Sequence, residues 1–112
     1  VKGRMLEDIV LLEVCKAAPS TMEAFKFKFD AGGEFDMVIY DKTSQNCRIY
    51  EIKHSTEANE KQTLHLRDAE KCQIVEKRFG PISGKFVLYR GKDTFAEGVQ
   101  YLNVENFLCG LK

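Results

Sequence analysis

The chain has no net charge, because 17 lysine and arginine side chains balance 17 aspartate and glutamate side chains. This balance argues against a strongly basic nucleic-acid clamp, although a local basic patch is compatible with it. A CxxC pair is also missing, which disfavours a zinc site or dithiol redox chemistry. We therefore expect Cys15, Cys47, Cys72 and Cys109 to be reduced thiols in a cytoplasmic protein.

Long apolar runs and repeats are missing as well. The sequence contains no segment long and apolar enough to span a membrane, no visible signal peptide and no internal repeat. Its apolar content, 44% of 112 residues, suffices for one hydrophobic core. We therefore expect a single domain over residues 1–112 without a membrane partner. Because the chain starts at Val1 rather than Met, we expect either a domain of a longer protein or a trimmed end.

The apolar pattern predicts the order helix, three strands, helix, strand. The first helix is apolar on most faces, so we expect it to be buried on more than one side. Strand–helix–strand connections join parallel strands, which predicts a mixed sheet with a helix on each face. The expected elements are a helix over 4–17, strands over 25–29, 35–40 and 48–53, a helix over 62–79, a strand over 85–90, a loop over 91–98, an edge strand over 99–104 and a final helical turn over 105–111.

Three carboxylates fall at positions that converge in this arrangement. Asp36 lies on the second strand in phase with Val38, and Glu51 lies on the neighbouring strand, so both can project from one face. Glu7 shares a helix stripe with Val10 and points toward the sheet, unless it faces solvent. Carboxylates this close repel one another unless a hard cation neutralises them, and oxygen ligands suit Mg²⁺ or Mn²⁺.

Lys53 follows Glu51 on the same side of its strand, in line with the apolar Ile49. A buried carboxylate and ammonium are costly unless they pair or hold a cation. On a solvated face the two would instead form an ion pair that contributes about 0–1 kcal/mol. Beside a cation site, Lys53 can orient or deprotonate an attacking water, or stabilise charge that develops on a phosphate.

Other polar residues near these positions carry structural predictions. Glu34 is expected on the face opposite Asp36, as a turn residue, and His54 is expected on the surface. Lys26 and Lys28 alternate with phenylalanines that we expect to point into the core. These two lysines either solubilise an edge strand or touch phosphate.

Three motifs in this order resemble the PD-(D/E)xK nuclease superfamily: Gly3-x-x-x-Glu7, then Gly33-Glu34-Phe35-Asp36, then Glu51-Ile52-Lys53. More narrowly, they resemble the nuclease-like C-terminal domain of a large group of prokaryotic AAA-type ATPases, and the late GKFVLYRG matches its closing pattern. The resemblance covers nearly the whole chain and implies a restriction-endonuclease-like αβββαβ core. Two features depart from the superfamily. Phe35 replaces the usual proline, and Leu66 follows Gln62 where some branches have a Gln-x-x-x-Tyr pair.

By this resemblance, the side chains of Asp36 and Glu51 and the backbone carbonyl of Ile52 bind Mg²⁺ or Mn²⁺. Glu7 would bind the ion directly or through water, and Lys53 would serve the attacking water. The implied reaction is hydrolysis of DNA phosphodiester bonds, with an ATPase domain of the same parent chain as partner. The alternative is a non-catalytic module that couples an AAA-type ATPase to a partner or to nucleic acid, which the zero net charge favours. The sequence leaves the substrate structure and the oligomeric state open.

Overall fold

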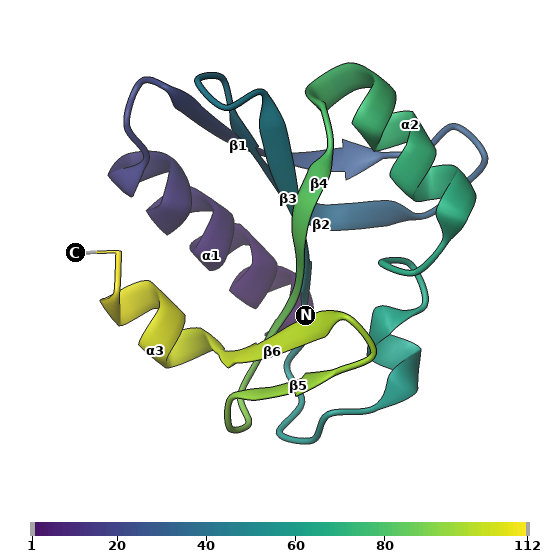
Figure 1. Cartoon of the computed structure of the whole chain (residues 1–112). Helices are drawn as coiled ribbons and strands as arrows, with labels where there is room; N and C mark the ends of the chain where they lie inside the picture. The colour runs from purple at the N-terminus through teal and green to yellow at the C-terminus, as the bar shows by residue number, and fades with distance from the viewer. Residues whose placement is uncertain (1, 112) are drawn as a thin grey trace.

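The computed structural model describes residues 2–111 and shows a mixed α/β domain (Figure 1). Its helices are α1 (Lys2–Ala17), the 3₁₀ helix η1 (Glu60–Thr63), α2 (Ala69–Phe79) and α3 (Val104–Cys109). Its strands are β1 (Met22–Lys28), β2 (Glu34–Asp41), β3 (Asn46–Ile52), β4 (Ile82–Tyr89), β5 (Thr94–Ala96) and β6 (Val99–Asn103). They form one sheet in the order β1-β2-β3-β4-β6-β5, with α1 and α3 on one face and α2 on the other.

The sheet has an antiparallel half and a parallel half. Strands β1, β2 and β3 form an antiparallel meander, whereas β3, β4 and β6 run parallel. The prediction of a mixed sheet flanked by helices is thus confirmed. The predicted strand over 99–104 is present as β6, but its predicted place at the sheet edge is wrong, because the segment expected to be a loop contributes β5, which pairs with β6 on its outer side.

Helix α2 is shorter than the predicted helix over 62–79. It begins at Ala69 because Asp68 has extended backbone and caps the first turn, accepting hydrogen bonds from the N–H groups of Glu70 and Lys71. The residues before this cap form η1 and a turn instead of helix. Gly80 ends the helix as predicted, with a φ of 86° that favours glycine.

Each face of the sheet carries its own hydrophobic cluster. The cluster beneath α2 includes Phe27, Phe29 and Val75, which confirms that alternate phenylalanines of the first strand point into the core. The cluster beneath α1 and α3 includes Val10 and Val14. Asp36 and Glu51 are 6% and 2% exposed, so both carboxyl groups are withdrawn from solvent, where a charge is costly unless it is compensated.

The outer side of α1 is exposed, contrary to the prediction that this helix is buried on more than one side. Val10 and Val14 are buried against the sheet, whereas Met5, Ile9 and Leu12 are 62%, 47% and 56% exposed. These three positions are spaced by four and three residues, so they form one apolar row along the helix. The pattern predicted the buried side correctly, but α1 has only the sheet and α3 as packing partners among the described elements.

The structure also bears on the state of the cysteines and on membrane-spanning helices. All four cysteines are free, with Cys47 and Cys72 buried and Cys15 and Cys109 exposed. Within residues 2–111, no helix combines the length and the hydropathy that a membrane span requires.

The cap of α2 predicts a specific stability loss. We expect Asp68→Ala to lower the free energy of unfolding by about 1 kcal/mol, because two backbone N–H groups lose their acceptor. Asp68→Asn should stay close to wild type, since asparagine is an equally good cap. Urea unfolding of the three proteins measures this difference. Equal stability of Asp68→Ala and wild type would contradict the capping role.

Candidate metal centre

A β-bulge in β2 determines where the carboxylates of this strand point. The register between β1 and β2 shifts between Phe25 and Phe27, so that Lys26 lies opposite two residues, Asp36 and Met37. Two residues facing one define a bulge, which bends the strand and redirects its side chains. Alternation along β2 is therefore interrupted at the predicted site.

The bulge corrects two predictions about Asp36. Val38 belongs to the cluster beneath α2, yet Asp36 approaches α1, so the two residues are out of phase. Glu34 does not face away from Asp36, since residues two apart on a strand share a side. One carboxylate oxygen from each of Glu7, Glu34 and Asp36 lies within 4.8 Å of the other two. Glu7 thus faces the sheet as predicted, and Glu34, rather than the predicted Glu51, completes this group of three.

Strands β2 and β3 separate at Asp36. Their antiparallel pairing ends with Met37 opposite Tyr50. Beyond this pair, Oδ2 of Asp36 accepts a hydrogen bond from the N–H of Ile52 at 2.8 Å, so that a side chain replaces the backbone acceptor of β2. The Asp36 carboxylate consequently lies in the gap between the strands. Because the N–H and C=O of a strand residue point to the same neighbour, the carbonyl of Ile52 faces this gap too.

Glu51 is buried beside Asp36 and is only partly satisfied. Its side chain is 2% exposed, and its Oε1 has no hydrogen-bond partner among the residues the structure describes. Its Oε2 lies 3.7 Å from Nζ of Lys53, whose side chain is 41% exposed. A buried polar atom without a partner costs about 1–3 kcal/mol. A cation placed in the gap would give this oxygen a partner.

The carboxylates are close enough to perturb one another. Burial, then the charge of Asp36 and a hydrogen bond with it, raise the pKa of Glu51 to about 9, although Lys53 opposes this shift. Burial and the same aspartate raise the pKa of Glu7 to about 6. At neutral pH, Glu51 therefore keeps a proton beside Asp36. A cation bound between the two would displace this proton.

Lys26, which we expected either to solubilise an edge strand or to touch phosphate, lies within the carboxylate cluster. Nζ of Lys26 is 3.7 Å from Oε1 of Glu7 and 3.5 Å from Oε2 of Glu34. These residues and Lys28 line a cavity of about 240 Å³. The alternation of Lys26 with Phe25 and Phe27 placed it on the face opposite these phenylalanines, but nothing in the sequence paired it with acids. His54 is exposed, as predicted.

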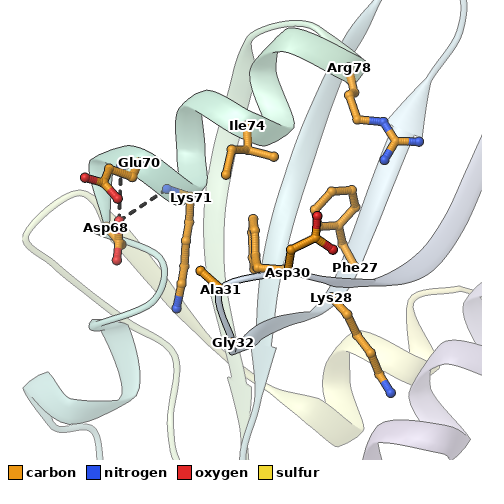
Figure 2. Close-up of a pocket in the computed structure, with 11 residues that line it drawn as sticks. Phe27, Lys28, Asp30, Ala31, Gly32, Asp68, Glu70, Lys71, Ile74 and Arg78 are labelled. Atoms are coloured by element: carbon orange, nitrogen blue, oxygen red, sulfur yellow. Dashed lines mark hydrogen bonds between the residues drawn. The ribbon is translucent and has the colours of Figure 1, made fainter.

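A second cavity, of about 530 Å³, lies between the turn after β1 and the outer side of α2 (Figure 2). Its basic residues Lys28, Lys71 and Arg78 face as many acidic residues, so its charges balance. The guanidinium of Arg78 stands 5.5 Å from the ring centre of Phe27. Asp68, also in the lining, is occupied as the cap of α2, as Figure 2 shows. This cavity lacks the buried, unsatisfied oxygen that distinguishes the gap beside Asp36.

The donors around the gap fit a hard divalent cation. Asp36 and Glu51 offer carboxylate oxygens, Ile52 offers a carbonyl, and Glu7 lies within reach of Asp36. Oxygen donors of this kind suit Mg²⁺ and Mn²⁺, whereas zinc sites rely on cysteine and histidine. No protein-family model, curated protein or solved structure matches the chain. The candidate centre therefore rests on geometry and chemistry.

The raised pKa of Glu51 predicts how stability depends on pH. A glutamate has an ordinary pKa of 4.5, and Glu51 reaches about 9 in the fold, so the folded state holds the extra proton between these values. We therefore expect the free energy of unfolding in EDTA to fall as pH rises from 5 to 9, by up to about 1.4 kcal/mol per pH unit. Urea unfolding at several pH values measures this slope.

Glu51→Gln is the matched control for this slope. Glutamine keeps the shape of the side chain and cannot ionise, so its stability should fall less steeply over the same pH interval. Contributions from titrating groups far from Glu51 are common to both proteins and cancel in the comparison. Parallel slopes for the variant and wild type would show that Glu51 does not hold the proton.

Proposed function

We propose that this domain is a divalent-metal-dependent nuclease that hydrolyses DNA phosphodiester bonds on a restriction-endonuclease-like αβββαβ core. The observation that carries the proposal is the Asp36 carboxylate in the gap between β2 and β3, beside the buried and unsatisfied Glu51. The order α1-β1-β2-β3-α2-β4 supports the core assignment. The resemblance of the three sequence motifs to the PD-(D/E)xK superfamily supports the reaction.

In this proposal the side chains of Asp36 and Glu51 and the carbonyl of Ile52 hold Mg²⁺ or Mn²⁺, and Glu7 binds the ion directly or through water. When bound, the cation would neutralise charge on the phosphoryl oxygens during attack by water. Glu51 also positions Lys53, because Oε2 and Nζ lie 3.7 Å apart. The ammonium of Lys53 can then orient the water or stabilise the developing charge from the exposed side of the site.

The partner that would present DNA is an ATPase domain of the same parent chain. The domain itself has no net charge, so it lacks the strong general attraction to phosphate that a basic domain provides. A linked domain that binds DNA raises the local substrate concentration at the site. DNA and an AAA-type ATPase are therefore the partners we propose.

One observation favours the alternative, a non-catalytic module that couples the ATPase to another protein. Met5, Ile9 and Leu12 form an exposed apolar row on α1. Contiguous exposed apolar surface often marks a protein interaction site. The buried carboxylates favour the nuclease, because a pure docking domain gains nothing from keeping a repulsive acidic cluster in its interior.

Metal binding tests the site without requiring catalysis. We expect Mn²⁺ titration by calorimetry to show binding to wild type and at least a tenfold weaker affinity for Asp36→Asn, because the isostere loses the anionic ligand but still accepts from Ile52. Glu105→Gln, at an exposed position on α3, removes the same charge far from the gap and should bind like wild type. Identical titrations for wild type and Asp36→Asn would refute the site.

Cleavage of DNA tests the reaction. Wild type should nick plasmid or branched DNA in Mg²⁺ or Mn²⁺, and Lys53→Ala should lose at least about 100-fold in rate, because stabilisation of the developing charge disappears. Lys77→Ala, an exposed residue of α2, serves as the charge-matched control. Nicking that survives Lys53→Ala would indicate a contaminating nuclease. No nicking by wild type in either metal would favour the coupling module.

A further inference from the structure

Lys26 forms ion pairs with two of the four carboxylates. Its Nζ lies 3.7 Å from Glu7 and 3.5 Å from Glu34. Asp36 has an oxygen within 4.8 Å of both glutamates, and it also lies in the strand gap beside Glu51 and the N–H of Ile52. Among the described residues, Glu51 keeps a buried oxygen without a partner, whereas Glu7 and Glu34 already contact a cation that the chain itself supplies.

The contacts of Lys26 differ from those of an ordinary surface ion pair. The side chains of Lys26, Glu7 and Glu34 are 23%, 20% and 32% exposed, so all three are largely withdrawn from solvent. The ammonium reaches two carboxylates from different elements, α1 and β2, and lies opposite the bulge that brings them together. By contrast, Lys16 and Glu13 are 67% and 43% exposed and pair along a single helix.

We propose that Lys26 is a tethered cation that fills the Glu7–Glu34 part of the cluster, so that the centre accepts one divalent ion instead of two. This inference rests on the proposed metal centre and specifies its stoichiometry. In this role Lys26 sets the number of divalent ions that the centre binds.

Charge balance supports a single ion. The four carboxylates of Glu7, Glu34, Asp36 and Glu51, when ionised, are neutralised by two ammonium groups, on Lys26 and Lys53, and one divalent cation. A second divalent ion beside Lys26 would leave two positive charges uncompensated in a largely buried site, which is unfavourable. Replacing Lys26 by a neutral residue removes this repulsion and frees two carboxylates that a second ion can bridge.

The test counts bound Mn²⁺ ions in wild type, Lys26→Met and Lys28→Met. Methionine is flexible and close to lysine in length, so it fills the same space without the charge. Lys28 lies two residues along the same strand and lines the same cavity, but it is exposed, which makes Lys28→Met the matched control. Equilibrium dialysis gives the number of ions per chain. Electron paramagnetic resonance detects the coupling expected of two ions about 4 Å apart.

We expect one ion in wild type and Lys28→Met, and two coupled ions in Lys26→Met. One ion in Lys26→Met, or two in wild type, would overturn the tethered-cation role while leaving the proposed metal centre intact. Binding only in Lys26→Met would overturn both proposals, because the wild-type centre would then accept no ion. Absence of binding in all three proteins would overturn both proposals.

Two further variants keep the test decisive if Lys26→Met does not fold. Lys26→Gln also removes the charge and should bind two ions, whereas Lys26→Arg keeps it and should bind one. Circular dichroism in EDTA verifies the fold of each variant. Mn²⁺ should raise the melting temperature of the neutral variants more than that of wild type, because each bound ion stabilises the folded state. Equal shifts would contradict the role of Lys26.

Discussion

The hydrogen bond from the N–H of Ile52 to the carboxylate of Asp36 is the contact on which the candidate centre depends. It lets β2 and β3 part without leaving a buried N–H unsatisfied, and it fixes an acidic side chain in the opening. Burial, together with the charge of Asp36 held there, raises the pKa of both Glu51 and Glu7. The acidic centre therefore depends on one exchange of hydrogen-bond acceptor: the carboxylate of Asp36, instead of a backbone carbonyl of β2, accepts from the N–H of Ile52.

The surrounding fold supports this arrangement at a cost to stability. The sheet buries Glu51 with one oxygen unsatisfied, and α1 adds Glu7 to a cluster that already repels itself. Lys26, near Glu7, and Lys53, near Glu51, offset part of this repulsion. Proteins commonly keep such locally unfavourable arrangements where function requires them. The apolar row outside α1 is a separate feature, and the proposed coupling role for that surface is compatible with the proposed catalysis in the gap.

Local patterns in the sequence were sufficient for most of the fold, because periods of 2 and 3.6 residues report directly which face of an element is buried. They also placed Glu7 on the inner side of α1. These patterns do not report the register between strands. The bulge opposite Lys26 depends on how β1 pairs with β2, and because of this bulge Asp36 is out of phase with Val38. The start of α2 was missed because the cap at Asp68 overrode the helix-compatible residues before it. Glu34 and Asp36 are two residues apart on a strand, so the sequence alone indicates that they share a side. Our prediction that Glu34 faces away from Asp36 was wrong.

The central claim is that one divalent cation binds between Asp36 and Glu51. A crystal of the protein grown with Mn²⁺ and measured at a wavelength where manganese scatters anomalously tests this claim most directly. We expect one anomalous peak within bonding distance of both carboxylates and of the carbonyl of Ile52, with Lys26 still between Glu7 and Glu34. A peak elsewhere, or no peak with Mn²⁺ in large excess, would contradict it.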